Sequence, residues 1–363
     1  MKKKLSKIFT WETMLVILLI VLWLVFDGKD RANDAAYIAA GRKAKDVFNV
    51  AKMLNGMGVY MIYSFMALGM ALILGMGDID ISIGASATLS AAVMGVSYRA
   101  MVNSGMANGT AFGLAVAACL CIGALCGFLN GFLITRFREL FPMIVTLGTQ
   151  LFYRGFCYLF LGGDTLKFDN DETWNQLKVL YNGSVKIGNL SFPTIIFWFL
   201  GFAVIFYIFL HLTTGGRKLF AIGENRTTAF YSGVNVDRFE LIMFVICGLM
   251  ASISAMFYMG SASATIRADA MTGYEMYAIA VVVLGGFSTS GGKGNIIGVI
   301  LSLVIFAVMK KGLGTMFGFA DSAVNLAVGI VLILASLLPN IIEDISKKIQ
   351  LKRQHVDIPA EKV

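Results

Sequence analysis

The sequence predicts an all-α, polytopic integral membrane protein with about ten transmembrane helices, some of them interrupted by glycines. Hydrophobic residues make up 58% of the 363 positions and charged residues 14%, whereas an ordinary soluble domain has roughly 45–50% and about 25%. A soluble chain of this length could not bury so much apolar surface. Glycine is frequent, at 39 residues, and proline is rare, at 4, so we expect glycines to be the helix breakers.

Ten segments are apolar enough to cross a hydrocarbon core of about 30 Å, which needs roughly 20 mainly apolar residues per helix. We predict them at residues 9–26, 54–76, 84–102, 110–134, 141–161, 193–212, 240–260, 274–290, 295–312 and 322–338. The first resembles a signal peptide, because lysines precede it, but no small-residue cleavage site follows, so we expect an uncleaved anchor. The ninth is weak, because it ends at Lys310 and Lys311.

The loops between these segments predict their orientation. Positive charge is spread through short loops, which indicates membrane topology rather than nucleic-acid binding. The lysine-rich stretch 1–7 and the loop 213–239 decide the direction and place both termini in the cytoplasm. We therefore predict a transmembrane domain at residues 1–338, with a cytoplasmic loop at 213–239 and an extracytoplasmic loop at 162–192. A cytoplasmic tail follows at 339–363.

Helix-breaking glycines gather in two places, Gly75–Gly84 and Gly285–Gly298, about 210 residues apart. Each cluster follows an apolar helix and precedes another, as in the internal repeats of transporters. The residues themselves are too dissimilar to establish a repeat. A third pattern, Gly123, Gly127 and Gly131, gives one helix a smooth face for close packing in lipid, and we expect it to be structural.

The first glycine cluster carries two carboxylates, Asp78 and Asp80, at the end of an apolar helix. Charge at this depth is costly unless it is hydrogen-bonded or faces water. Two compatible interpretations stay open. Either Ser82 or Asp80 caps the helix that begins near Gly84, or these residues form a polar constriction on a transport route.

Two further charged residues lie in apolar surroundings. Arg154 sits among aromatic residues near the predicted outer end of its helix, where it could extend its charge toward water or contact a substrate. Glu275 lies at a predicted helix start, where a carboxylate is favoured by the helix dipole, so we expect it to cap.

The motifs of common enzymes are missing from the sequence. Gly285–Gly294 resembles a phosphate-binding loop, but Gly292 separates the required glycine from Lys293, and Gly294 stands where Ser or Thr is needed. The only histidines are His211 and His355, so no nucleophile–His–acid set is available. The five cysteines lack metal-like spacing and are expected to pack. We predict no enzyme activity, no bound cofactor or metal, and no nucleic-acid partner.

The loop 213–239 is the most informative polar stretch. Asn225 is placed to cap a short helix from Glu224 to Tyr231, and Gly233 is placed to end it. A short amphipathic helix in a cytoplasmic loop either lies on lipid or docks in a groove on a partner. Composition alone leaves both interpretations open.

Four sequence patches occur in a recognisable order and spacing. They are Gly-Asp-Ile-Asp-Ile-Ser-Ile-Gly at 77–84; Asn130–Thr135 with Pro142, Val145–Thr149 and Arg154-Gly155; Ala221–Gly223 with Asn225 and Ser232–Val236; and Gly273–Glu275 with Gly285-Gly286 and Ser290–Gly294. Together they resemble, over almost the full chain, the permease subunit of bacterial ABC importers for sugars of the ribose, galactose and xylose type. Two departures stand out: Asp78 replaces a glycine of that family, and Met276-Tyr277 replaces a frequent Leu-Asp.

The resemblance implies a mechanism and partners. Two permease chains, often identical, form the pore in the bacterial cytoplasmic membrane. A separate ATPase subunit, which binds ATP and Mg, drives them, and an extracytoplasmic sugar-binding protein delivers a monosaccharide. By the same resemblance, the loop 213–239 holds the helix that couples to the ATPase, through Gly223, Glu224, Asn225, Arg226, Ala229, Ser232 and Gly233. Candidates for the transport pathway are Asp78, Asp80, Ser82, Arg154 and Glu275.

Other transporter classes stay open as alternatives. Nucleoside importers and branched-chain amino-acid importers of the ABC type share the general plan. An ion-coupled secondary transporter would need carboxylates that titrate along the path, and Asp78, Asp80 and Glu275 are available for that role. The loop 213–239 opposes this last alternative, because such a transporter does not need a coupling loop.

Overall fold

The computed structural model describes residues 11–41, 43, 48–168, 183–188, 190–261 and 265–316, together with residues 326, 329, 330 and 333. The predicted tail 339–363 and nearly all of the predicted tenth segment, 322–338, lie outside the described residues, as does part of the predicted outer loop 162–192.

The described chain is a helical bundle, which confirms the predicted all-α class. Its helices are α2 (Trp11–Ala39), α3 (Val50–Gly75), α4 (Ile83–Asn103), α5 (Asn108–Arg136), α6 (Pro142–Leu161), α8 (Thr194–Tyr207), α9 (Thr214–Glu224), α10 (Arg226–Tyr231), α11 (Val236–Ser261), α12 (Tyr274–Leu284) and α13 (Ile296–Met316). A π-helical turn, η1 (Ile208–Leu212), continues α8.

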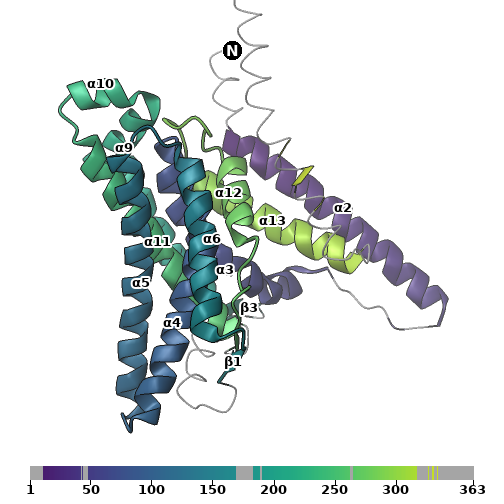
Figure 1. The fold of residues 1–363 in the computed structure, drawn as a ribbon. Helices are drawn as coiled ribbons and strands as arrows, with labels where there is room; N and C mark the ends of the chain where they lie inside the picture. The colour runs from purple at the N-terminus through teal and green to yellow at the C-terminus, as the bar shows by residue number, and fades with distance from the viewer. Residues whose placement is uncertain are drawn as a thin grey trace, which may run out of the picture.

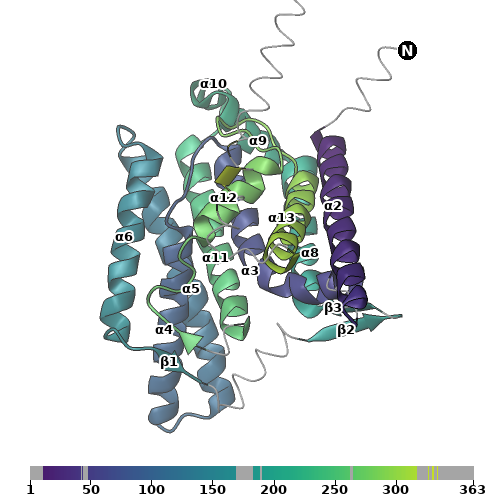
Figure 2. The ribbon, with the colours of Figure 1, turned by 90° about the vertical axis from the view of Figure 1, so that its right-hand side faces the viewer.

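Two short antiparallel ladders complete the described structure. β1 (Leu166–Lys167) pairs with β4 (Thr265–Ile266), and β2 (Ser184–Ile187) pairs with β3 (Leu190–Pro193). The first ladder joins the segment after α6 to the segment before α12, so two parts of the chain that are far apart in sequence are held together at one end of the bundle (Figures 1 and 2).

Seven of the described helical segments are long and apolar enough to cross a membrane. They are 11–39, 56–75, 108–136, 142–161, 194–212, 236–261 and 296–314. Of the remaining predicted segments, α4 is a 21-residue helix, while α12 has only 11 residues and therefore rises about 16 Å. The prediction of a continuous spanning helix at 274–290 is wrong, because the chain turns at Gly285 after half the thickness of the bilayer core.

Two predicted boundaries also shift. α2 continues through the charged stretch after Phe26, with Arg31 and Asp27 paired at 2.9 Å along one helix face. α13 runs past Lys310 to Met316, because the Lys310 ammonium lies 3.8 Å from the centre of the Tyr277 ring. Such a cation–π contact stabilises a lysine inside an apolar bundle, so this lysine does not mark a helix end.

Helix α3 is the centre of the bundle. In its most apolar stretch, 89% of the residues are buried, and it packs against α8, α11, α12 and α13. Helices α4, α5 and α6 lie on one side of it, and α2 and α13 lie on the other (Figure 2). The short helices α9 and α10 project from one end of the bundle (Figures 1 and 2).

The glycine stripe of α5 packs against α11 as predicted. A Cβ on Gly123 would lie 1.7 Å from the Ser252 hydroxyl oxygen, and one on Gly127 would lie 2.2 Å from the Phe244 carbonyl oxygen. Gly248 makes the matching contact from α11, since its Cβ would lie 2.0 Å from the Gly123 carbonyl oxygen. The two helix backbones therefore touch without intervening side chains.

Candidate functional site

The two predicted glycine clusters end α3 and α12 in the same way. In each, a glycine with positive φ follows the helix, Gly77 at 85° and Gly286 at 92°. Its N–H and the next N–H donate back to carbonyl groups of the last helical turn, in the pattern of a Schellman motif. The pairs are Gly77 to Leu74 (2.9 Å) and Asp78 to Ile73 (3.1 Å), and Gly286 to Val283 (3.0 Å) and Phe287 to Val282 (3.2 Å). We call these turns the first and the second helix break.

The end of α9 lies between the end of α3 and the loop that follows the second helix break. A Cβ on Gly223 would lie 2.2 Å from the Gly75 carbonyl oxygen and 2.4 Å from the Gly292 nitrogen. Gly292 in turn donates its N–H to Gly75 at 3.0 Å, and Gly291 packs on Gly77. We call Gly75, Gly77, Gly223, Gly291 and Gly292 the glycine junction. At Gly223 and Gly291 the backbones meet at distances that exclude a side chain.

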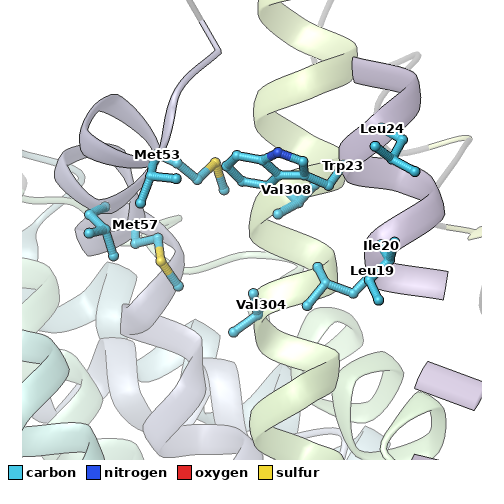
Figure 3. A pocket seen from close by; sticks show the side chains of 10 residues that line it. Leu19, Ile20, Trp23, Leu24, Met53, Met57, Val304 and Val308 are labelled. Carbon is cyan, nitrogen blue, oxygen red and sulfur yellow. The ribbon is translucent and has the colours of Figure 1, made fainter. Parts of the chain in front are cut away.

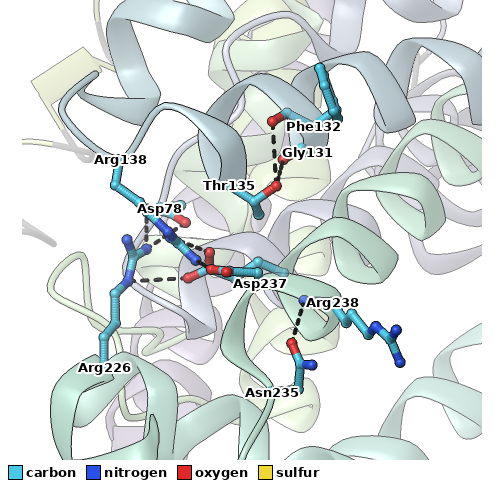
Figure 4. A network of polar contacts seen from close by, with 10 residues as sticks. Asp78, Gly131, Phe132, Thr135, Arg138, Arg226, Asn235, Asp237 and Arg238 are labelled. Atoms are coloured by element: carbon cyan, nitrogen blue, oxygen red, sulfur yellow. Dashed lines mark hydrogen bonds and ion pairs between the residues drawn. The ribbon is translucent and has the colours of Figure 1, made fainter.

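A network of ion pairs ties α10 to the first helix break (Figure 4). Arg226, the first residue of α10, contacts Asp78 at 2.6 and 2.7 Å and Glu240 of α11 at 3.2 Å. Arg138, after α5, pairs with Glu240 at 2.5 Å and also with Asp237. We call these five residues the inner ion network. Two planar guanidinium groups thus hold three carboxylates, a geometry suited to bidentate contact.

Electrostatics explain why Asp78 needs Arg226. The Asp78 side chain is only 4% exposed, and burial raises the pKa of its carboxyl group. The Arg226 guanidinium acts in the opposite direction and favours the charged form. Removing the guanidinium would leave this buried carboxylate without compensation.

The inner ion network combines predicted and missed residues. Arg226 is a predicted coupling residue and Asp78 a predicted pathway residue, and the structure brings the two together. The sequence reasoning missed Arg138, Asp237 and Glu240. One signal was available in the sequence, because Glu240 stands at the start of the predicted apolar segment 240–260, where a carboxylate requires a partner.

Helix α10 has the predicted caps but different bounds. Asn225 accepts the Thr228 N–H at 2.9 Å, and the chain reverses at Gly233, where φ is 84°. The expected helix from Glu224 to Tyr231 is wrong at its start, because Glu224 ends α9 and Asn225 separates the two helices. The sequence reasoning did not predict α9.

The side chains of α10 divide between the bundle and the surface. Ala229 is 3% exposed, whereas Phe230 and Tyr231 are 64% and 82% exposed. Ser232 donates its hydroxyl to the Thr228 carbonyl at 2.9 Å and so closes the last turn. The result is a short rigid helix with two aromatic side chains directed away from the bundle.

Asp80 lies in a separate buried cluster. It accepts the Ser82 N–H at 2.9 Å and the Ser82 hydroxyl at 2.7 Å. Asn130 of α5 donates to the Ser82 hydroxyl at 2.7 Å, and Tyr153 of α6 donates to Asn130 at 3.0 Å. Ser82 makes no side-chain cap on α4, so the capping interpretation is wrong for Ser82. Asp80 instead fixes the turn before α4 and joins it to α5 and α6.

Arg154 and Glu275 meet the bundle at the start of α12. Arg154 donates to the carbonyl groups of Ala270 at 2.9 Å and Ala268 at 3.3 Å, so it does not extend into solvent as one interpretation held. Glu275 is 3% exposed and accepts the Gly273 N–H at 3.1 Å, which confirms its capping role. Gln150 of α6 donates to the same carboxylate oxygen at 3.3 Å.

Two other features bear on what this chain could bind. An apolar pocket of about 370 Å³ lies between α2, α3 and α13, and Trp23, Met53 and Val308 are among the hydrophobic side chains that line it (Figure 3). Among the described residues, no group of three or more His, Cys, Asp and Glu side chains could hold a metal ion.

Comparisons with known proteins agree with this architecture. A family model described as "Branched-chain amino acid transport system / permease component" matches residues 52–336. The ribose import permease protein RbsC of Escherichia coli (strain K12) is 30% identical over 300 residues, which cover 81% of this chain and 87% of that protein. The autoinducer 2 import system permease protein LsrD of the same strain is 28% identical over 310 residues, 84% of each chain. No solved structure matches.

Proposed function

Because the chain belongs to the family of permease components of the branched-chain amino acid transport type, we propose that it is the transmembrane subunit of an ATP-driven, binding-protein-dependent importer of a monosaccharide. It is a multi-pass membrane protein and a transport subunit rather than an enzyme. The relatives that import ribose and autoinducer 2 favour a sugar over a nucleoside or a branched-chain amino acid.

One observation carries the coupling part of the proposal: an exposed short helix is bonded to a buried helix break. The Arg226–Asp78 pair joins α10 directly to the turn between α3 and α4. A separate ATPase that binds ATP and Mg and moves α10 would therefore move that turn as well. The residues proposed to couple the chain to the ATPase are Gly223, Glu224, Asn225, Arg226, Ala229, Ser232 and Gly233.

The same proposal assigns the remaining partners and regions. Residues 1–338 would form the permease domain of the bacterial cytoplasmic membrane, with the tail 339–363 and both termini in the cytoplasm. A second copy of the chain would complete the pore, and an extracytoplasmic binding protein would deliver the sugar near the loop 162–192. Asp80, Ser82, Arg154 and Glu275 would lie along the path, and Asp78 would serve coupling.

The competing ion-coupled mechanism loses one of its three carboxylates. Asp78 is held in two contacts by Arg226, which favours a fixed charge over one that gains and loses a proton along the path. Asp80 and Glu275 stay available to that mechanism, so a direct test is needed.

The first test recovers the partners of the chain. The tagged chain is extracted from its native membrane in mild detergent, and co-purifying proteins are identified by mass spectrometry. We expect an ATPase with a phosphate-binding loop in roughly stoichiometric amount. A chain recovered alone, with uptake in membranes that lack ATP, would contradict the proposal.

The second test probes α10 itself. We expect Ala229→Trp to abolish ATP-driven uptake while the chain stays in the membrane, because the side chain at this position is buried beneath the helix. Gly201→Leu serves as the control, because nothing lies within 4 Å of a Cβ at Gly201 of α8. Unchanged uptake in Ala229→Trp, with normal amounts of chain in the membrane, would show that α10 does not couple.

A further inference from the structure

Helix α12 begins opposite the middle of α6. Gln150 and Arg154 lie on either side of the midpoint of α6, which runs from Pro142 to Leu161, and both contact the start of α12 or the segment before it. Because α6 is long enough to cross the membrane, the N-terminus of α12 lies near the middle of the bilayer. Half-helices that start at this depth form cargo sites in other transporters, because their N–H groups point into the path.

Two charged side chains at this place keep one atom each without a hydrogen-bond partner. Among the described residues, Nη2 of Arg154 and Oε2 of Glu275 are buried and unpartnered, although Nη1 and Oε1 are both engaged. No ion pair joins the two groups to each other in the described chain. Buried charged groups are normally satisfied, so this donor and this acceptor call for a partner.

The neighbouring backbone leaves room for the carboxylate and is itself strained. A Cβ on Gly84 would lie 2.2 Å from Oε2 of Glu275, so glycine in the first turn of α4 makes room for the carboxylate in this position. Met271, just before α12, has φ 51° and is the one non-glycine residue with positive φ among the described residues. Backbone conformations of this kind gather at binding sites and at segments that move.

The segment that contains Met271 is held in place by hydrogen bonds that leave the second nitrogen of Arg154 free. The Ala270 carbonyl accepts from Nη1 of Arg154 at 2.9 Å and from the Thr88 hydroxyl of α4 at 2.5 Å. A cargo hydroxyl could therefore bind Nη2 of Arg154 while Nη1 keeps the side chain in position.

The free atoms define the chemistry of the cargo. A single hydroxyl group accepts one hydrogen bond and donates another, so it can bridge one free guanidinium nitrogen and one free carboxylate oxygen. An amino-acid carboxylate prefers two parallel bonds from a guanidinium, but Nη1 of Arg154 is already used by backbone carbonyls. A phosphate would be repelled by Glu275. Neutral, hydroxyl-rich molecules fit these constraints best.

We propose that Glu275, Arg154 and Gln150, at the N-terminus of α12, form a transient binding site for the hydroxyl groups of a neutral sugar in transit. The assignment rests on the proposed function, because it takes the sugar to be the cargo. It adds the place in the permease where that cargo is held.

The test uses the complete importer, with its ATPase and binding protein, reconstituted in liposomes. Uptake of radiolabelled ribose, galactose and xylose is measured beside ATP hydrolysis, at saturating binding protein. Glu275→Gln keeps the shape of the side chain, and Arg154→Lys keeps the charge but removes the second nitrogen. Glu139→Gln and Arg99→Lys, at exposed positions, are the matched controls.

We expect both site variants to carry about tenfold less sugar for each ATP hydrolysed, because each loses a charge-assisted hydrogen bond, while ATP hydrolysis is retained. A second readout separates binding from folding. The wild-type complex should carry deoxy analogues of its sugar more slowly than the parent sugar, and Glu275→Gln should lose part of this discrimination. If Glu275→Gln does not fold, Arg154→Lys decides the same question.

The outcomes are distinguishable. Wild-type uptake by both variants, with unchanged discrimination, would overturn the site and leave the proposed function intact. ATP-driven uptake of leucine but of none of the three sugars would overturn the assignment to hydroxyl groups. Sugar uptake that does not depend on ATP would overturn the proposed function, and the same two variants would still decide the site.

Discussion

The first and the second helix break have the same backbone and different chemistry. Each places a glycine with positive φ after an apolar helix and returns two N–H groups to the last turn. The first break then carries Asp78 and Asp80, both buried and bonded to other helices. The second carries Phe287 instead, and its Gly286 packs on the Trp11 ring of α2.

The difference shows that the segment α9–α10 contacts the two halves of the chain through different interactions, backbone packing in one case and an ion pair in the other. Gly223, near the end of α9, packs on the backbone of Gly75 at the end of α3 and of Gly291 and Gly292 in the loop after the second break. Arg226, three residues later, contacts the first break through charge. Shape therefore links α9 to both halves of the chain, whereas the ion pair gives the first half a stronger and more specific link.

The largest effect is expected from a substitution at Gly223, because a side chain there would push the end of α3 away from the loop that follows the second break. Gly223→Val would place a side chain against the Gly75 carbonyl and the Gly292 nitrogen, both backbone atoms. We expect the free energy of unfolding in detergent to fall by roughly 3 kcal/mol or more, measured by denaturation of the purified chain. The control is Gly155→Val, where nothing lies within 4 Å of the Cβ. Equal stability of the two variants would mean that α9 does not fill the glycine junction.

A smaller effect is expected from the charge link, which only the first break has. Arg226→Gln should lower stability by about 2 kcal/mol, because buried Asp78 loses its partner while Arg226 itself is partly screened by solvent. Stimulation of the ATPase should fall as well. The double variant with Asp78→Asn should regain most of the stability, since no charge is then left unpaired.

An exposed pair provides the control for that experiment. Arg267 and Asp269 contact each other at 2.8 Å but are 61% and 51% exposed, so Arg267→Gln should leave stability unchanged. If the Arg226 and Asp78 variants behaved like this pair, with independent and negligible effects, the inner ion network would not join α10 to the first break.

The smallest effect is expected from substitutions at the glycine with positive φ that both breaks contain. Gly77→Ala and Gly286→Ala should each cost about 1–2 kcal/mol from backbone strain, because alanine is strained at positive φ, and Gly286→Ala should cost more in total because its Cβ also meets the Trp11 ring. Thermal unfolding of the two variants compares them directly. Gly201→Ala, within α8, is the reference for a glycine whose Cβ meets open space. A neutral result at one break alone would show that the two turns are not equivalent.

Local signals were read correctly from the sequence, and contacts between distant segments were not. The glycine clusters, the Asn225 cap and the Glu275 cap depend on neighbours within a few residues, so their residue types indicated them. Asp78 and Arg226 are 148 positions apart, and nothing in either stretch specifies the other. Asp78 was therefore assigned to the pathway alone.

The sequence predicts a helix at 274–290, whereas α12 ends at Leu284, and this difference has a physical reason. Residues 285–290, Gly-Gly-Phe-Ser-Thr-Ser, carry no charge, so the absence of charge extends the predicted apolar segment past Gly285. The turn there depends on close packing of Gly285 on Val299 and Gly298 of α13, a contact that composition does not record. For the same reason, Arg154 and Glu275 could be named separately as pathway candidates, whereas Gln150 and the assembly of the three residues at the start of α12 could not.

The direct backbone contact between α5 and α11 determines which parts of the bundle can move. At Gly127 and Gly248 the two helix backbones touch directly, and the short Ser252 side chain packs on Gly123. Sliding of one helix past the other would therefore produce clashes, so we expect the two helices to move together. Glu240 of α11 belongs to the inner ion network, and Ser252, which donates to the Cys119 carbonyl at 3.0 Å, lies about 18 Å further along the helix. We expect a rotation that starts at α10 to be carried along α11 to this contact with α5, and the adjustment to fall on the helices packed around the pair.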